Sequence, residues 1–257
     1  MEKPLILVTN DDGITAPGLR KLVALMRKIG DVTVVAPDSP QSGMGHAITL
    51  DTTLYSKKMK LEPVTEGYVE YSCSGTPADC VKLGLQELLP RPPDICVSGI
   101  NHGSNSSINV IYSGTMSAAI EAGLEGVPAI GFSLCDYSWE ADFSQAEEFI
   151  ERIVRQALQN GMPKGTVLNV NIPKLNKKDI KGIKVCRQAK ANWKEKFDKR
   201  TNPMGKEYYW LTGVFELLDK GEDTDEWALA NGYISVVPTH FDLTAHHAIQ
   251  ELNTWEL

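Results

Sequence analysis

The alternation of short apolar runs with amphipathic segments constrains the fold of this chain most. The runs PLILVTN at 4–10 and DVTVVAP at 31–37 are typical of buried strands. The segment 16–30 between them has the apolar spacing of a helix that ends at a glycine. Because strands alternate with helices in this way, we expect an α/β fold in which helices cover both faces of a mostly parallel sheet.

The alternation extends to about residue 174 and then changes. Further helices are predicted at 76–89, 113–126 and 144–161, and further strands at 93–100, 128–134, 165–173 and 180–188. The segment 191–213 mixes charged, turn-forming and aromatic residues, which predicts a protruding β-hairpin. An acidic loop at 221–232, a strand at 233–238 and a helix at 244–255 complete the chain. We therefore divide it into a core, 1–174, and a C-terminal part, 175–257, whose last strand and helix can pack back on the core.

Charge and composition exclude several classes of protein. The chain of 257 residues carries a formal net charge of -7, with a pI of about 5.3, so no nucleic-acid partner is expected, because such binding needs a basic face. No segment approaches the ~20 apolar residues of a membrane helix, and the N-terminus lacks the features of a signal peptide. Five dispersed cysteines without a C-x-x-C pair indicate reduced thiols and a cytoplasmic location.

Polar residues follow three of the predicted strands. Asn10, Asp11, Asp12 and Gly13 follow the first strand, and glycine- and serine-rich loops follow the strands at 31–37 and 93–100. Ligands of doubly wound sheets bind outside the carboxyl ends of the strands, where such loops meet. Three polar loops at one edge therefore predict a site.

Four of these residues are candidate metal ligands. Asp11, Asp12, Ser42 and Asn101 offer only oxygen donors, which suit a hard cation such as Mg²⁺ or Mn²⁺. A cation would also relieve the repulsion between two adjacent carboxylates. A simple polar turn explains Asp11 and Asp12 equally well when they are considered alone.

The segment YSGTMSAA supplies a candidate anion site. Ser113, Gly114 and Thr115 open a predicted helix, and the N-terminus of a helix binds phosphate through its free amide groups. An ordinary Ser/Thr helix cap is the alternative, and no Walker motif is present. Metal donors beside an anion site favour phosphoryl transfer or hydrolysis.

Six segments spread over nearly the whole chain resemble the stationary-phase survival protein family SurE. They are ILVTNDDGITAPGL, VVAPDSPQSGMGHAITL, SGTPADCVKLGL, PDICVSGINHGSNSSINVIYSGTMSAAIEAG, VLNVNIP and YISVVPTHFDLTAHH. The resemblance implies a Rossmann-like three-layer sandwich. It also implies a metal-dependent phosphatase that hydrolyses nucleoside 5'-monophosphates, often 3'-monophosphates and in some members polyphosphate. A C-terminal part that exchanges elements between subunits implies a homodimer or homotetramer.

The resemblance also assigns residues. The family's metal ligands fall on Asp11, Asp12, Ser42 and Asn101, and its phosphate-contacting segment on Ser113, Gly114 and Thr115. We expect Asp11, Asp12 and Asn101 to take part in catalysis. We expect Asn10 and His102 to contribute to substrate binding, and His46 is a weaker candidate for contact with phosphate or the leaving group.

One loop departs from the family pattern. Many members read Asn-x-Gly-x-Asp where this chain has Asn105, Ser106, Ser107, Ile108 and Asn109. The missing glycine and carboxylate put substrate preference in question, whereas the four expected metal ligands are all present.

Two mechanisms and two other classes of function stay open. A polarised water attacks phosphorus in line, or one of the two aspartates attacks it directly and becomes phosphorylated. A nucleotide-binding regulatory oligomer without turnover and an exopolyphosphatase are the alternatives to a nucleotidase. A dinucleotide-binding module is disfavoured because NDDGITAPG stands where G-x-G-x-x-G is required.

Overall fold

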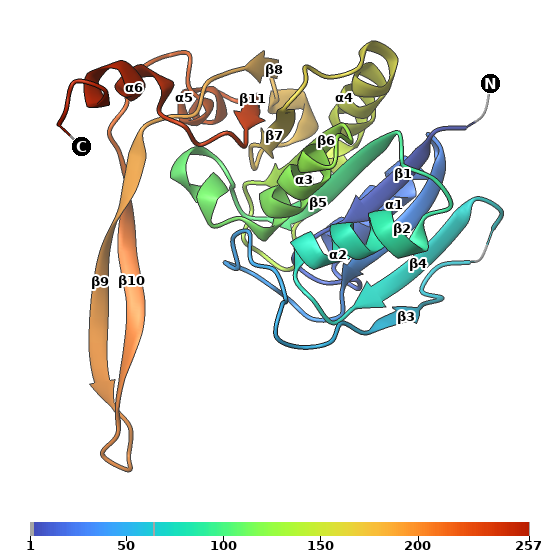
Figure 1. The fold of residues 1–257 in the computed structure, drawn as a ribbon, viewed down its shortest axis with the longest axis horizontal. Coiled ribbons are helices and arrows are strands. Elements are labelled where there is room, and N and C mark those ends of the chain that lie inside the picture. Colours follow the sequence, from blue (N-terminus) through green and yellow to red (C-terminus); the bar gives the residue numbers. More distant parts are fainter. Residues whose placement is uncertain (1–2, 64, 257) are drawn as a thin grey trace.

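The structure is a computed structural model that describes residues 3–63 and 65–256. These residues form one nine-stranded sheet in the order β3-β4-β2-β1-β5-β6-β7-β11-β8, together with a separate hairpin of β9 and β10 (Figure 1). The strands of the sheet are β1 (Leu5–Thr9), β2 (Asp31–Pro37), β3 (Ser56–Lys58), β4 (Tyr68–Cys73), β5 (Ile95–His102), β6 (Ala129–Leu134), β7 (Thr166–Ile172), β8 (Gly182–Val185) and β11 (Tyr233–His240). All neighbours are parallel except β3 with β4 and β7 with β11.

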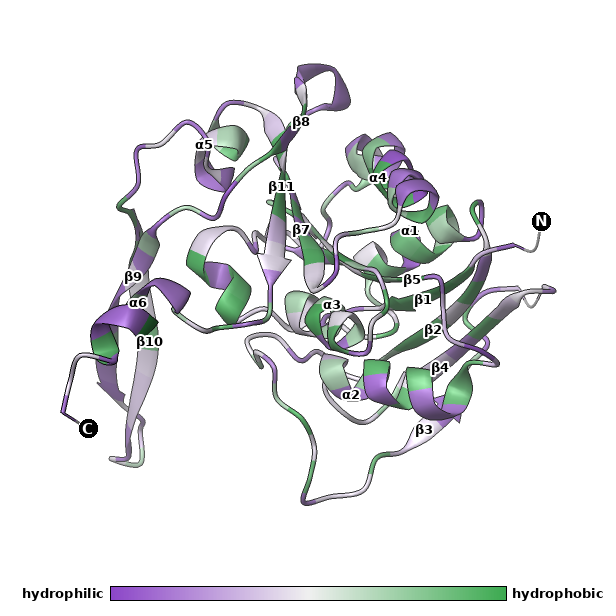
Figure 2. Ribbon diagram, turned by 45° about the horizontal axis from the view of Figure 1, so that its top comes forward, coloured by the Kyte–Doolittle hydropathy of each residue, from purple (hydrophilic) through white to green (hydrophobic). Residues whose placement is uncertain are grey.

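Helices cover both faces of the sheet, which confirms the expected α/β sandwich. Helices α1 (Pro17–Met26) and α4 (Glu147–Asn160) pack on one face, and α2 (Pro77–Leu83) and α3 (Gly114–Leu124) pack on the other. Side chains alternate along a strand, so β1 contributes Ile6 and Val8 to the first core and Leu7 to the second. Figure 2 shows the apolar colouring concentrated on the central strands and on the helix faces turned toward them.

The order of the strands places a topological switch point beside β1. From β1 the chain continues to β2 and β4 on one side, and it then crosses to β5 and β6 on the other side. Strand order reverses at this point, and in open parallel sheets the carboxyl ends of the two diverging strands form the ligand crevice. The residues that follow β1 and β5 therefore lie at the edge where sequence reasoning expected the site.

The C-terminal part contributes two strands to the central sheet and also forms a separate hairpin. Strands β8 and β11 extend the sheet beyond β7, whereas β9 (Ala191–Thr201) and β10 (Glu207–Leu217) form the predicted hairpin and project away from the body (Figure 1). The last helix, α6 (His246–Leu252), buries none of its residues. No helix in the described part of the chain is both long and apolar enough to span a bilayer.

Three local predictions differ from the structure. The predicted acidic loop contains a short helix, α5 (Asp225–Ala230), because the Thr224 side chain caps it by accepting from the Trp227 amide. Strand β4 was not predicted, although it lies between β2 and β3 in the sheet. The helix expected at 16–30 ends at Met26, and a turn leads to β2.

Candidate active site

Asp11 lies directly after β1 and faces the first turn of α3. Its side chain is nearly buried, and the Thr115 hydroxyl donates to Asp11 Oδ1 at 2.6 Å. A Cβ atom at Gly114 would lie 2.6 Å from the Asp11 Cβ, so only glycine lets the helix approach this closely. The structure thus brings together Asp11, Gly114 and Thr115, three of the residues that sequence reasoning selected.

The surrounding residues disfavour the ionised form of Asp11. Burial and the neighbouring Asp12 carboxylate raise the pKa of Asp11 to about 6, although hydrogen bonds from Thr115 oppose the shift. Burial thus disfavours the charged form of Asp11, and a positive charge beside it would lower this penalty.

Asp12 is paired with His102 at the end of β5. The Asp12 Oδ2 atom lies 2.9 Å from His102 Nδ1 and accepts the His102 backbone N–H at 3.3 Å. The imidazole is buried, with Trp139 stacked on it at 5.1 Å between ring centroids and Phe143 edge-on at 5.1 Å. His102 was expected at the site, but its aromatic surroundings were not predicted.

Asn101 lies where β5 breaks its register with β6. The register shifts between Ser98 and Asn101, and such irregularities reorient side chains at the ends of strands. Asn101 Nδ2 donates to the carbonyl oxygen of Gly103 at 2.9 Å and more weakly to that of His102 at 3.3 Å. These contacts use the nitrogen, so within the described residues the side-chain oxygen of Asn101 is left for a ligand.

The loop that carries Ser42 is bound at two points. The Gln41 N–H donates to the Asp11 carbonyl at 2.7 Å, and the Gly45 N–H donates to the Tyr112 carbonyl at 3.1 Å. Exposed Ser42 therefore lies in a loop that connects the two sides of the candidate site. His46, farther along the loop, contacts the buried Glu121 of α3 at 2.7 Å, and this contact attaches the loop to the helix.

The side-chain oxygens at the ends of β1 and β5 fit the demands of a hard cation. Asn10 donates through Nδ2 to the Gly13 carbonyl, but its Oδ1 atom is buried without a partner among the described residues. A buried acceptor of this kind is costly unless a donor or a cation satisfies it. Asn10 Oδ1 and the side-chain oxygens of Asp11, Asp12 and Asn101 thus provide acceptors of the type that a hard cation binds. No three His, Cys, Asp or Glu side chains cluster as a metal group within 3–63 and 65–256, and the expected set, with two carboxylates, does not require one.

Comparison with known proteins decides the family. The family model described as Survival protein SurE matches residues 6–195, most of the chain. The chain belongs to the SurE family.

Named relatives cover the full length. The protein called 5'-nucleotidase SurE from Flavobacterium psychrophilum is 67% identical over 257 residues, which is 100% of this chain and 99% of that protein. The one from Chlorobium limicola, with the same name, is 43% identical over 100% of this chain and 98% of its own length. The crystal structure of SurE from Aquifex aeolicus superposes with a TM-score of 0.82 at 39% identity, covering 97% of this chain and 98% of that one.

The loop at 105–109, which departs from the expected SurE pattern, contains one residue with a left-handed backbone conformation. Ser107 has a φ of 53°, a left-handed conformation that favours glycine. Its N–H donates to Asp225 Oδ2 at 2.8 Å, and its hydroxyl donates to the Ala189 carbonyl at 2.9 Å. In the same loop, the Trp193 indole N–H donates to Asn109 Oδ1 at 2.8 Å. The C-terminal part therefore holds the loop between Asn101 and α3.

A buried amide network that sequence reasoning missed fixes the start of this loop. The Asn105 N–H donates to Asn171 Oδ1 at 2.8 Å, and the Asn105 side chain donates to the Ser133 hydroxyl at 2.8 Å. Asn169 donates to the Asn105 carbonyl at 2.8 Å. Asparagines two apart in the strand VLNVNIP point to one face, and that spacing in an otherwise apolar run was the available signal.

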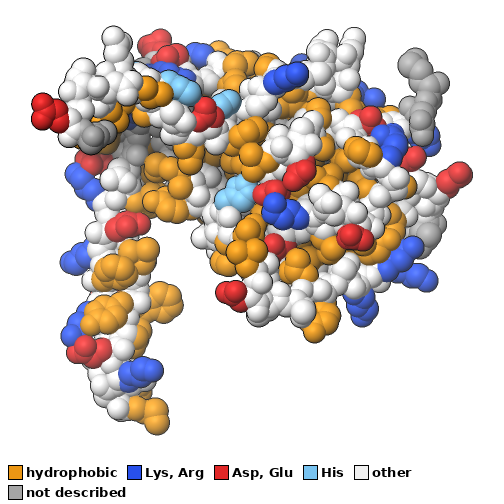
Figure 3. All heavy atoms as spheres, viewed as in Figure 1, with side chains coloured by type: hydrophobic (Ala, Val, Ile, Leu, Met, Phe, Trp, Pro, Cys, Tyr) orange, Lys and Arg blue, Asp and Glu red, His pale blue; other side chains and the backbone are white. Residues whose placement is uncertain are grey.

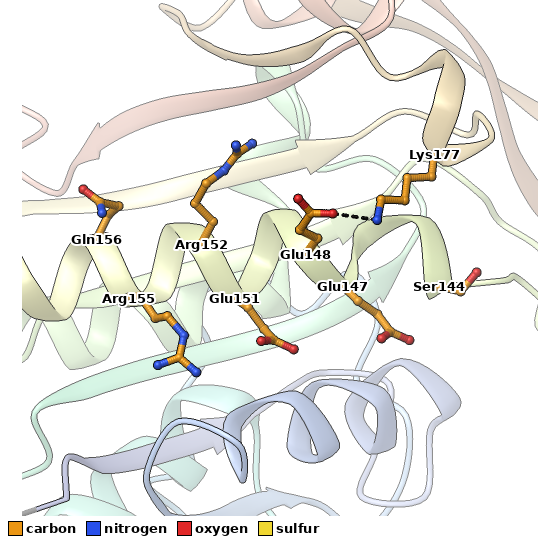
Figure 4. Close-up of a pocket in the computed structure, with 8 residues that line it drawn as sticks. All are labelled: Ser144, Glu147, Glu148, Glu151, Arg152, Arg155, Gln156 and Lys177. Atoms are coloured by element: carbon orange, nitrogen blue, oxygen red, sulfur yellow. Dashed lines mark ion pairs between the residues drawn. The ribbon is translucent and has the colours of Figure 1, made fainter.

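A hollow on the described surface lies away from these residues. It measures about 530 Å³ and follows the outer side of α4, with charged side chains of both signs, among them the Lys177–Glu148 ion pair (Figure 4). None of the candidate site residues lines it. We therefore place the site by its chemistry at the ends of β1 and β5.

Proposed function

We propose that this SurE protein is a metal-dependent phosphomonoesterase that hydrolyses nucleoside 5'-monophosphates to a nucleoside and phosphate. The observation that carries the proposal is the juxtaposition of Asp11 with the N-terminus of α3, through the Thr115 contact at 2.6 Å. Carboxylates for a cation and a helix N-terminus for an anion then share one crevice. The name of the full-length relatives, 5'-nucleotidase SurE, supports the same substrate class.

In this proposal one divalent cation per subunit, Mg²⁺ or Mn²⁺, is held by Asp11, Asp12, Ser42 and Asn101. When bound, it withdraws charge from the phosphate and lowers the pKa of water. Thr115 orients the Asp11 carboxylate, and His102 orients that of Asp12. Oxygen ligands of this kind favour a hard cation over zinc.

The proposed phosphate contacts are Ser113, Gly114 and Thr115, with Asn10 and His102 at the border. The Ser113 side chain caps α3 by accepting from the Met116 N–H. Water adds to phosphorus as the ester bond to the 5'-oxygen breaks, and the released oxygen takes a proton. Direct attack by Asp11 or Asp12 with a phosphorylated intermediate is the alternative, and burial of Asp11 suits either role.

The same crevice is proposed to accept nucleoside 3'-monophosphates, because the phosphate groups required for recognition are the same. We propose the cytoplasm as its compartment, in line with five free cysteines in the described part of the chain. The core, 1–174, would supply the site, and the C-terminal part, 175–257, would supply subunit contacts.

A homodimer or homotetramer is proposed from the exposed apolar side chains of that C-terminal part. The hairpin exposes Phe197, Trp210 and Leu211, and Leu243 is 93% exposed beside α6. Figure 3 shows hydrophobic side chains on the projecting hairpin, interspersed with charged ones. Apolar surface of this extent is typical of protein–protein contacts.

Phosphate release from 5'-AMP tests the proposal. The purified protein is assayed with Mg²⁺, with Mn²⁺ and with EDTA, across a panel of 5'- and 3'-monophosphates and a polyphosphate. We expect turnover of 5'-monophosphates that EDTA abolishes and that added metal restores. Turnover of polyphosphate alone, or of no substrate with any metal, would reject the proposal.

A further inference from the structure

Two exposed aromatic side chains border the metal-binding end of the crevice. They belong to the loop after β6: Tyr137 is 74% exposed and Trp139 is 57% exposed. Large aromatic rings are usually buried, so two exposed rings in one short loop require a reason.

Trp139 contacts the candidate site through the imidazole ring of His102. Its indole stacks on His102 with 5.1 Å between centroids and 15° between planes, and His102 Nδ1 lies 2.9 Å from Asp12. Since Phe143 meets His102 edge-on, the imidazole is fixed among Asp12, Trp139 and Phe143. One face of the indole is used in this stack, and the exposure of Trp139 leaves other parts of the ring open to a ligand.

Tyr137 is fixed against the neighbouring residue of the same site loop. A Cβ atom at Gly103 would lie 2.4 Å from Tyr137 Cε1, so the phenol ring rests on the backbone next to His102. The Gly103 N–H donates to the Leu134 carbonyl at 2.8 Å. Both aromatic residues are thus attached to the end of β5.

The loop itself is held in place by polar contacts. The Cys135 N–H donates to the Ile172 carbonyl at 2.8 Å, and Asp136 pairs with Lys174 at 2.9 Å. The Ser138 N–H donates to Asp136 Oδ1 at 3.1 Å. Rings placed on an ordered loop lose little conformational freedom when a planar ligand stacks on them.

From these contacts we infer that Tyr137 and Trp139 form the surface that receives the base of the nucleotide. The inference rests on the proposed function and adds to it the residues that distinguish a nucleotide from other phosphate monoesters. With the phosphate at Asp11 and α3, the ribose separates phosphorus from the base, and the base extends beyond the ring of His102. Stacking on an aromatic side chain recognises any base, because every base has a π-face.

The test compares two substrates that differ only by the base, 5'-AMP and ribose 5-phosphate. We expect Trp139→Ala to lower kcat/KM for 5'-AMP, mainly through a raised KM, about 10-fold more than it lowers kcat/KM for ribose 5-phosphate, because only 5'-AMP loses a stacked base in addition to any effect on His102. Tyr137→Ala acts in the same direction, Trp139→Phe retains most of the affinity, and Trp139→Leu does not. Tyr55→Ala is the matched control, because Tyr55 is 73% exposed and lies beside β3, at the far edge of the sheet.

Several outcomes overturn the inference. An equal loss of kcat/KM for 5'-AMP and ribose 5-phosphate in Trp139→Ala would mean that Trp139 acts only by positioning His102. If the variant with such losses also forms a smaller assembly in size-exclusion chromatography, Trp139 belongs to a subunit contact instead. Unchanged KM for 5'-AMP in Trp139→Ala and Tyr137→Ala would remove any role in base binding. If wild type hydrolyses 5'-AMP no better than ribose 5-phosphate, base recognition is rejected and the proposed phosphatase function stands. If wild type hydrolyses neither substrate, both the proposed function and the inference are rejected.

Discussion

Asp11 is a buried carboxylate whose charged form its surroundings disfavour. It is buried and stands next to Asp12, and among the described residues only Thr115 and nearby backbone groups donate to it. These features raise the pKa of Asp11 to about 6, whereas in the unfolded chain it has its ordinary value of 3.8. Ionising Asp11 therefore requires more free energy in the folded protein than in the unfolded chain. A bound cation would remove that penalty.

The stability of the metal-free protein should therefore depend on pH through Asp11. Between about pH 4 and pH 6 the folded state binds the proton and the unfolded state releases it, so the Asp11 contribution destabilises the fold as pH rises and is constant above pH 6. In EDTA, Asp11→Asn should raise the thermal midpoint at pH 7.5 relative to wild type by about 3 °C or more, and change it little at pH 4. Mg²⁺ or Mn²⁺ should raise the midpoint of wild type only.

Ser107 gives a second prediction at this scale. Its left-handed backbone disfavours any side chain, and its buried hydroxyl contributes a hydrogen bond to Ala189. Ser107→Gly loses the bond but relieves the backbone, whereas Ser107→Ala loses the bond and keeps the strain. We expect Ser107→Ala to be less stable than Ser107→Gly by about 1 kcal/mol in urea unfolding. The reverse order would contradict the left-handed conformation.

At the scale of elements, α2 anchors the loop that leads from Ser42. Asp79 and Thr76 form a capping box at its start, and Asp79 also accepts from the Thr49 N–H at 3.0 Å and the Thr49 hydroxyl at 2.6 Å. Burial alone would raise the pKa of Asp79, but these hydrogen bonds outweigh it and lower the pKa. The stabilisation is thus present above pH 4 and is lost as pH falls through the lowered pKa.

Asp79→Ala should destabilise the protein and loosen the loop. Loss of the cap and of the two bonds to Thr49 costs about 2–3 kcal/mol, or about 5–10 °C in thermal midpoint. Hydrogen exchange of the Thr49 amide should accelerate, and Asp51→Ala, at an exposed position two residues on, serves as the control. Unchanged exchange at Thr49 would show that Asp79 does not anchor the loop.

Elements with strong periodicity could be predicted from the sequence, and contacts between distant elements could not. Strand β1 and helix α3 were predicted because their apolar spacing is regular, and Asp11 with Gly114 followed from their position at strand and helix ends. Strand β4 was not predicted from the sequence. The stack of Trp139 on His102 depends on how β6 lies beside β5, which no local pattern encodes. The spacing of Asn169 and Asn171 shows that they share a face of the strand, but their partner Asn105 follows only from the packing of β7 and β6 beside β5.

At the scale of the whole molecule, the hairpin of β9 and β10 has no partner within the described chain that would cover its apolar residues. Phe197 and Leu211 are directly opposite in the ladder, and each is more than half exposed. A two-stranded hairpin is marginally stable alone in water. A second subunit would bury this face and stabilise the hairpin.

Replacing this face should reduce the assembly without unfolding the core. Phe197→Glu with Leu211→Lys places opposite charges across the ladder, which preserves the hairpin but removes the apolar contact. Light scattering after size-exclusion chromatography should give a smaller mass than wild type. The matched control exchanges Lys194 and Glu216, an exposed ion pair of the same hairpin, and should keep the wild-type mass. A wild-type protein that is already monomeric would contradict the proposed oligomer.

Hydrolysis of 5'-AMP by wild type, Asp11→Asn and Asp12→Asn in saturating Mn²⁺ tests the central claim most directly. We predict turnover by wild type and a loss of at least about 100-fold in kcat/KM for each variant, with unchanged circular dichroism, because each substitution removes a proposed ligand charge while preserving its shape. Near-normal turnover in both folded variants would contradict the assignment of Asp11 and Asp12 to the metal and phosphate site.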